Sequence, residues 1–208
     1  MRGSTPTVPT RPIRTPVPES GRHRRGTLVV SGDGDADALI NTDPLALMIA
    51  MLLDQQVPIE WAFASPLRLA QRLGGVLDAA EIAAMDPEEL VAVAAAKPAI
   101  HRFPAMMARR IHKLCEHLVV EYQGNAASIW ADANDADVLY DRLLAVPGYG
   151  PVKSQILIAV LAKRFGFRPD GWEAVAGVFA TEDLRSVADL DDPTALGRLR
   201  EKRQPDSQ

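Results

Sequence analysis

The sequence predicts an all-α fold, with at most one short strand near its start. Proline follows aspartate at three places, and each pair marks a helix start, because the aspartate caps the free amides and the proline has no amide to satisfy. These pairs are Asp43-Pro44, Asp86-Pro87 and Asp192-Pro193. From Phe103 to Tyr122, apolar residues recur at three- and four-residue steps, which predicts a long helix with one buried face. The chain has 208 residues, 47% of them hydrophobic, so it is long enough to bury a core.

The predicted elements follow one another from residue 27 onward. Residues 27–31 form a short strand or an extended arm, which the turn-forming residues 32–35 end. Helices are predicted over residues 57–73, 103–122, 126–131, 136–145, 151–165, 172–178 and 193–201. In the helix over 103–122, the predicted buried face comprises Phe103, Met107, Ile111, Leu114 and Leu118. Arg109, Arg110 and Lys113 lie off this face, and Gly124-Asn125 is predicted to end the helix in a left-handed cap.

Charge is unevenly spread along the chain. Residues 1–25 hold six arginines and one glutamate, a charge of +5, whereas the net charge of the whole chain is −4, so residues 26–208 carry −9. We expect residues 1–26 to be a disordered basic tail, either a weak tether for DNA or a solvated segment without a role. Residues 27–203 are then one helical domain, and residues 204–208 a flexible C-terminus. Since the body is acidic, any contact with nucleic acid must be local.

Composition also limits which cofactors the protein can bind and indicates its location in the cell. Cys115 is the single cysteine, which excludes an internal disulfide and any zinc or iron-sulfur site built from several thiolates. The histidines, at positions 23, 101, 112 and 117, show no metal-ligand spacing, so no metal site is predicted. No apolar run reaches 18 residues and no secretory signal is visible, so we expect a cytoplasmic protein that makes no membrane contact.

A helical hairpin is predicted around residue 149. Pro147 ends an apolar helix, Gly148-Tyr149-Gly150 makes the turn, and Pro151 opens the next helix. Two glycines permit backbone torsions that other residues avoid, and the amides that follow the turn point outward at a helix N-terminus, where a phosphate oxygen can bind. Such a loop holds the DNA backbone without reading sequence. The alternative is an ordinary turn between two helices.

In three blocks the chain resembles the helix-hairpin-helix (HhH-GPD) DNA glycosylase superfamily. The blocks are residues 51–56 (MLLDQQ), residues 102–111 (RFPAMMARRI) continuing to residues 122–124 (YQG), and residues 146–150 (VPGYG). The resemblance extends over residues 28–200 and is closest to an actinobacterial base-excision-repair type that lacks the iron-sulfur cluster. It implies two helical lobes with a central cleft, the hairpin on one rim, and a target base flipped into the cleft.

The resemblance also implies site residues. The DNA-binding set would be Gln55, Gln56, Val146, Gly148, Tyr149, Gly150 and Lys153. The glutamine pair would lie near the gap left by the flipped base, although two glutamines that end a helix are also ordinary surface residues. Lys153 would contact a phosphate or simply be solvated.

The resemblance implies a reaction type as well. Bifunctional members carry a lysine nucleophile where this chain has Val152, so lyase activity is not expected. The catalytic carboxylate of the family falls at Asp170, although Asp170 lies in a Pro-Asp-Gly sequence typical of a turn, and Glu173 is a second candidate. Trp61 and Trp172 would either stack on a flipped base or pack in the core.

These observations predict a monofunctional DNA glycosylase of base excision repair, a monomer that acts on double-stranded DNA in the nucleoid. No cofactor is expected, although a monovalent cation is compatible with the carbonyls of the hairpin. One alternative is a non-catalytic protein that binds DNA or senses lesions on the same scaffold. Another is a helical module whose hairpin contacts protein, which the acidic body favours.

Overall fold

The computed structural model describes residues 28–203, and these residues form an all-α fold, as predicted. The α-helices are α1 (Gly34–Thr42), α2 (Pro44–Leu53), α3 (Ile59–Arg72), α4 (Ala79–Ala84), α5 (Pro87–Ala95), α6 (Pro104–Tyr122), α7 (Ala136–Ala145), α8 (Pro151–Arg164), α9 (Trp172–Ala176) and α10 (Ala195–Arg203). Short 3-10 helices are η1 (Ala126–Ile129), η2 (Gly177–Phe179) and η3 (Val187–Asp189). The predicted tail over residues 1–26 and the predicted flexible C-terminus over residues 204–208 lie outside the described residues.

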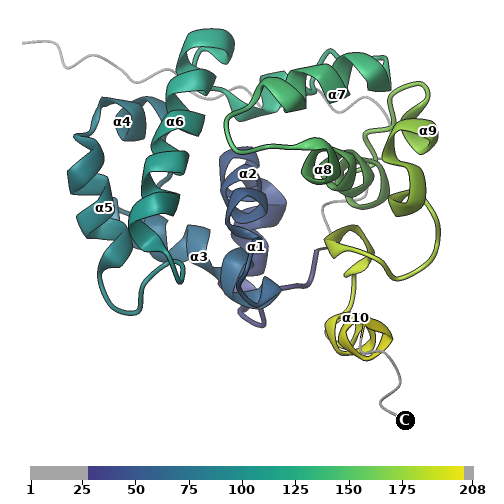
Figure 1. Ribbon diagram of the computed structural model, residues 1–208, viewed down its shortest axis with the longest axis horizontal. Coiled ribbons are helices and arrows are strands. Elements are labelled where there is room, and N and C mark those ends of the chain that lie inside the picture. Colours follow the sequence, from purple (N-terminus) through teal and green to yellow (C-terminus); the bar gives the residue numbers. More distant parts are fainter. Residues whose placement is uncertain (1–27, 204–208) are drawn as a thin grey trace, which may run out of the picture.

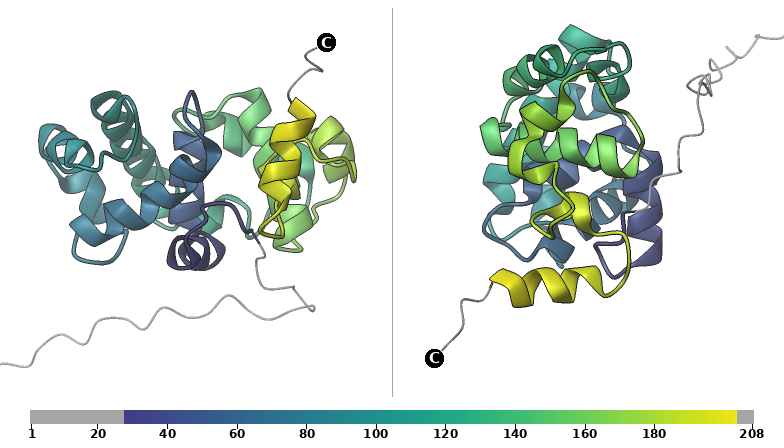
Figure 2. Two further views of the ribbon diagram at one scale, coloured as in Figure 1. Left: turned by 90° about the horizontal axis from the view of Figure 1, so that it is seen from below. Right: turned by 90° about the vertical axis from the view of Figure 1, so that its right-hand side faces the viewer.

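Helix α2 lies between two groups of helices. Figures 1 and 2 show α4, α5 and α6 on one side of it and α7, α8, α9 and α10 on the other. Within the first group α6 packs against α4 and α5, and within the second α8 packs against α7 and α9. Nine of the ten residues of α2 are buried, from Leu45 to Leu53. An apolar helix of this kind is the shared core of the two groups.

Aspartate caps start several helices. Asp43 and Asp86 accept bonds from the first amides of α2 and α5, which confirms two of the three predicted starts. The third was placed too early, because α10 begins at Ala195. The carboxylate of Asp192 instead accepts bonds from both the amide and the hydroxyl of Thr194, at 2.7 and 2.6 Å, and holds residues 192–194 in a turn.

The long helix α6 has the predicted length and buried face, with differences at both ends. Phe103 is the residue before the helix and is 39% exposed, so it lies outside the buried face. At the other end Gln123 already has a left-handed conformation, with φ +54°, one residue before the predicted glycine cap.

The segment before α1 is an extended arm rather than a strand. Its Leu28 and Val30 side chains are buried. The amide of Leu28 donates to Asn41 Oδ1 (3.0 Å), and the amide of Val29 donates to the carbonyl of Leu190 (3.1 Å). The arm therefore joins α1 to the segment that precedes α10.

Within residues 28–203, no helix by itself has the length and hydropathy needed to cross a membrane. Only α1 and α2 taken together meet those two criteria, and they are bent by 114° relative to each other.

Candidate nucleic-acid interface

The turn between α7 and α8 contains two glycines, and the backbone conformation requires a glycine at only one of these positions. Gly148 is exposed and has φ +86°, and a Cβ at this position would overlap the Cδ1 of the buried Leu52. Gly150 has φ −114° and ψ 179°, an extended conformation that any residue adopts, and a Cβ there would meet no atom within 4 Å. The predicted need for an unusual torsion is therefore met at Gly148 alone. At Gly150 the missing side chain leaves open space.

Tyr149 fastens this turn to α2. Its side chain is buried, and its hydroxyl donates to the carbonyl of Met48 at 2.8 Å. Burial raises the pKa of the phenol well above its ordinary value. Val146 is buried as well, and its carbonyl accepts the amide of Tyr149 at 3.0 Å. Of the predicted DNA contacts, these two side chains point into the protein.

The first turn of α8 presents free amides beside the open space at Gly150. The amide of Ser154 is the one that reaches back to the carbonyl of Gly150, at 3.0 Å, so the amides of Val152 and Lys153 precede the first bond within the helix. The side chain of Val152 is 59% exposed. Amides at this end of a helix attract anions.

Lys153 is turned towards α2 rather than towards solvent. Its side chain is half-buried, and its ammonium group donates to the carbonyl of Met51 near the end of α2. Burial lowers the pKa of Lys153 to about 8, while the negative charge of Asp54 acts in the opposite direction and the positive charge of Arg110 adds to the lowering. The ammonium group of this α8 residue therefore lies near residues of α2 and α6.

The two glutamines after α2 have different surroundings. The amide nitrogen of the Gln55 side chain donates to the carbonyl of Leu52 (2.7 Å) and approaches Met107 Sδ (3.7 Å), and its oxygen accepts from Arg110 (2.8 Å). Gln56 is exposed and has φ +56°, a left-handed conformation that a residue with a side chain rarely adopts. Gln55 is held by the protein, while Gln56 projects from it.

His101 also holds this loop. Its Nε2 lies 3.0 Å from the carbonyl of Gln55, and its Nδ1 accepts the amide of Phe103 at 3.0 Å. Because Nδ1 is an acceptor, the proton of the neutral ring is on Nε2 and is donated to Gln55. The pKa of His101 is lowered, chiefly by burial, which favours this neutral form.

A groove of about 310 Å³ runs between the loop that joins α2 to α3 and helix α10. It is lined by Asp54, Val57, Pro58, Ile59, Leu196, Leu199 and Arg200. Arg200 also pairs with Glu60 at the start of α3. Five of the seven lining residues are apolar, and the charged ones are Asp54 and Arg200. Sequence reasoning did not single out Asp54, although it directly precedes the glutamine pair.

Asp170 lies away from the hairpin. Its backbone pairs with the residues that start α7: its amide donates to the carbonyl of Asn134 (2.7 Å), and its carbonyl accepts the amide of Ala136 (2.9 Å). Its side chain is exposed. Since the hairpin follows the other end of α7, the ten residues of that helix separate the two by about 15 Å at 1.5 Å per residue.

The remaining candidate side chains serve the fold. Trp61 donates its indole N–H to the carbonyl of Ala99 at 3.2 Å, and Trp172 is buried with Arg168 over its ring. Arg109 pairs with Glu88 at 2.7 Å. Among residues 28–203, no group of three or more histidine, cysteine, aspartate and glutamate side chains is placed to hold a metal ion.

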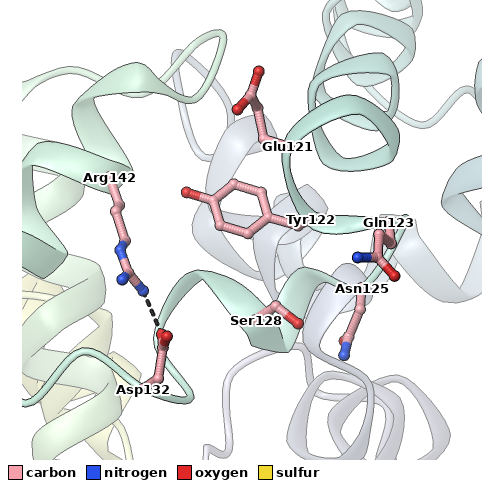
Figure 3. A pocket seen from close by; sticks show the side chains of 7 residues that line it. All are labelled: Glu121, Tyr122, Gln123, Asn125, Ser128, Asp132 and Arg142. Atoms are coloured by element: carbon pink, nitrogen blue, oxygen red, sulfur yellow. Dashed lines mark hydrogen bonds and ion pairs between the residues drawn. The ribbon is translucent and has the colours of Figure 1, made fainter.

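A larger cavity of about 520 Å³ lies between the end of α6, η1 and α7 (Figure 3). It is lined by Glu121, Tyr122, Gln123, Asn125, Ser128, Asp132 and Arg142. Arg142 pairs with Asp132 at 2.6 Å and lowers the pKa of that carboxyl group. Figure 3 shows the hydroxyl of Tyr122 pointing towards Arg142. The ion pair and its polar neighbours make this a hydrophilic surface cavity.

Comparison with known proteins identifies the family. No curated protein matches the chain. One solved structure with a related arrangement is an endonuclease III trapped in a covalent intermediate with DNA, an estranged-adenine complex, which is 20% identical over 78% of this chain and 67% of that chain, with a TM-score of 0.40. The family model of the HhH-GPD superfamily of base excision DNA repair proteins matches residues 49–202, from the middle of α2 to the end of α10. The chain therefore belongs to the HhH-GPD superfamily of base excision DNA repair proteins.

Proposed function

We propose that this protein is a monofunctional DNA glycosylase, which holds double-stranded DNA at the α7–α8 hairpin, flips out a damaged or mispaired base and hydrolyses its N-glycosidic bond. The observation that supports it most is the open space at Gly150 beside the free amides of α8, at the surface of a protein of this repair family. A phosphate group fits this arrangement, because it needs donors and a close approach to the backbone.

The loop after α2 suggests how the duplex is probed. Gln56 projects from a loop whose preceding residue is held by Arg110 and His101. A polar side chain on a rigid support can enter the space that a flipped base leaves, and the support limits the entropy lost on binding. We assign this contact to Gln56 and a supporting role to Gln55.

The reaction type follows from the first turn of α8. The side chain of Val152, at the position of the lysine nucleophile in bifunctional members, cannot form a Schiff base. Lys153 is the next residue, but its ammonium group faces the end of α2. Hydrolysis without strand cleavage is therefore the expected outcome, and the roles of Asp170 as catalytic carboxylate and of a cation at the hairpin carbonyls stay predictions.

A panel of duplexes tests the proposal. Each duplex contains uracil, hypoxanthine, 3-methyladenine, 8-oxoguanine or a mismatch, and the enzyme is in excess over the DNA. We expect abasic sites that appear as strand breaks only after alkali treatment, and no covalent adduct after borohydride reduction. Breaks without alkali would contradict the monofunctional assignment, and intact bases in every duplex would contradict the enzyme assignment.

A second candidate is a non-catalytic protein that binds lesions on the same scaffold. The exposed position of Asp170, at the far end of α7, favours it, because the predicted catalytic carboxylate is remote from the hairpin. This candidate requires tighter binding to a duplex with a mismatch or an abasic-site analogue than to a matched duplex, with no base released from either.

A further inference from the structure

The groove beside α10 contains a carboxylate close to the hairpin. Asp54 caps the end of α2, where its amide donates to the carbonyl of Ala50 at 3.0 Å, and its side chain is half-buried. It lines the groove of about 310 Å³ and directly precedes the glutamine pair. Three residues earlier, the carbonyl of Met51 accepts the ammonium group of Lys153. Asp54 thus lies where the groove, the glutamine loop and α8 meet.

Charge links Asp54 to the hairpin helix. The carboxylate acts on the titration of Lys153, whose ammonium group it stabilises against the cost of burial. Arg110 of α6 acts on the same ammonium group with opposite sign. The Asp54 carboxylate therefore lies close enough to act on an ammonium group of α8 on which Arg110 of α6 also acts.

The groove is large enough for a small ligand. Its volume of about 310 Å³ lies at the lower end of the range of roughly 300–1,000 Å³ typical of small-molecule sites. Val57, Ile59 and Leu199 give it apolar surface, which suits the face of a nucleobase. Asp54 supplies a negative charge, while Arg200, which also lines the groove, is paired with Glu60. A fixed negative charge stabilises the oxocarbenium-like sugar that forms as a glycosidic bond breaks.

We propose that Asp54 is the catalytic carboxylate of this protein, acting on a nucleotide whose base enters the groove between the α2–α3 loop and α10. The assignment rests on the proposed glycosylase function. The C1′–N bond breaks and its electron pair leaves with the base. A water oxygen forms the new C1′–O bond, one water proton passes to the Asp54 carboxylate, and the departing base takes up that proton, so that Asp54 returns to its starting state.

Asp170 is the competing assignment. Its backbone pairs with the start of α7, which lies about 15 Å from the hairpin at 1.5 Å per helical residue, and its side chain is exposed. The charges that act on Lys153 are those of Asp54 and Arg110. The two assignments therefore predict opposite results for the same pair of variants.

The experiment compares single-turnover base release from the duplex panel by the wild-type protein, Asp54→Asn, Asp54→Glu and Asp170→Asn. Glu89→Gln is the matched control for the loss of one negative charge, because Glu89 is exposed on α5, which lies on the opposite side of α2 from α10 (Figures 1 and 2). We expect Asp54→Asn to lower the rate constant by about 100-fold or more, with duplex affinity unchanged or higher. Asp54→Glu should recover part of the rate, and Glu89→Gln should match the wild type.

A second measurement does not depend on activity. The Lys153 ammonium group is titrated by NMR in lysine-labelled protein, with Lys153→Met to assign its resonance. Asp54→Asn should lower the pKa of Lys153 further, and Asp54→Glu should restore it. An unchanged titration in Asp54→Asn would overturn the placement of the carboxylate beside the ammonium group.

The activity results separate the inference from the function on which it rests. A wild-type protein that releases a base while Asp54→Asn releases it equally fast overturns the role of Asp54 alone. Loss of activity in Asp170→Asn in that case assigns the reaction to Asp170. A wild-type protein that releases no base from any duplex overturns the proposed function, and the catalytic role of Asp54 with it.

Discussion

At the scale of single residues, the two hairpin glycines have different reasons to lack a side chain. Gly148 has a left-handed conformation and lies against Leu52, so its requirement comes from the fold. Gly150 has ordinary torsions and open space around it, so nothing in the described protein requires a glycine there. Under the proposed function, a DNA phosphate that approaches the backbone closely would supply that requirement.

Alanine at each position separates the two requirements. Gly148→Ala should destabilise the protein by roughly 1–3 kcal/mol, because it combines a strained torsion with an overlap. Gly150→Ala should leave stability unchanged or raise it by up to about 1 kcal/mol, yet weaken duplex binding roughly tenfold. Urea denaturation and fluorescence anisotropy measure the two effects. Equal duplex affinity of Gly150→Ala and the wild type would remove the hairpin from the interface.

Lys153 makes a pH-dependent contribution to stability. Its pKa of about 8 in the folded protein lies below the ordinary value near 10.4, so between these values the unfolded chain binds more protons. Stability from this group therefore rises with pH over that window, at most by about 1.4 kcal/mol per pH unit, and the group opposes folding below it. Lys153→Met removes the effect, so the free energy of unfolding of the variant should exceed that of the wild type most at pH 7. Urea denaturation at pH 7, 8 and 9 measures the difference, and a constant difference would contradict the lowered pKa.

At the scale of elements, the loop after α2 combines a residue that is bonded to the protein with a residue that projects into solvent. The side chain of Gln55 is bonded to Leu52 and Arg110, whereas Gln56 is exposed. The two glutamines are adjacent in the sequence, but their side chains have different surroundings in the structure.

Alanine substitution in the loop should show this division. Gln55→Ala should cost roughly 1–2 kcal/mol of stability, because Arg110 and Leu52 lose partners in a partly buried place. Gln56→Ala should leave stability unchanged and reduce the preference for a duplex with a mismatch or an abasic-site analogue over a matched one. Thermal denaturation and competitive binding measure the two. A stability loss in Gln56→Ala equal to that in Gln55→Ala would be inconsistent with the assignment.

Local patterns predicted most of the helices, because the relevant forces act between near neighbours, but they did not predict α1 or α4. The prediction of a helix over residues 136–145 is confirmed at both ends, since Asp135 caps α7 and Val146 with Pro147 ends it. Prediction was wrong where a local bond competes, as at Asp192, whose carboxylate binds Thr194 and delays α10. Phe103 likewise fits the periodicity but precedes the first turn of α6.

The candidate site was less predictable, because its contacts join residues far apart in the sequence. Arg110 meets Gln55 across 55 positions, and Lys153 meets Met51 across 102. No local pattern shows that Lys153 turns inward, or that Tyr149 is bonded to Met48 rather than to a ligand. Likewise, the groove that makes Asp54 a candidate exists only because α10 returns to the loop after α2.

At the scale of the whole molecule, the balance of charge limits how DNA is held. Residues 26–208 carry −9, and Arg109 and Arg110 are engaged with Glu88 and Gln55. In the proposed complex, neutral amides of the hairpin would hold phosphate without releasing many counterions. Binding by the body should therefore depend on salt less than binding by a basic protein does.

A salt titration of duplex affinity measures this balance. We expect the slope of log K against log salt concentration to be only about −2 to −3 for a chain that begins at residue 27, since each neutralised phosphate contributes about −0.9. The full chain, with a further charge of +5 in residues 1–25, should give a steeper slope. Identical slopes for the two chains would show that the basic segment does not contact DNA.

Because α2 is buried almost throughout, is bonded to the α7–α8 turn and packs against α6, its amides reach solvent when the two groups separate or unfold together. Hydrogen exchange along residues 47–53 should therefore be the slowest in the protein and should report the global free energy of unfolding. Faster exchange there than in α6 or α8 would mean that the groups open as independent units. Exchange rates of these amides, measured with and without DNA, would therefore report how strongly the two groups of helices are held together.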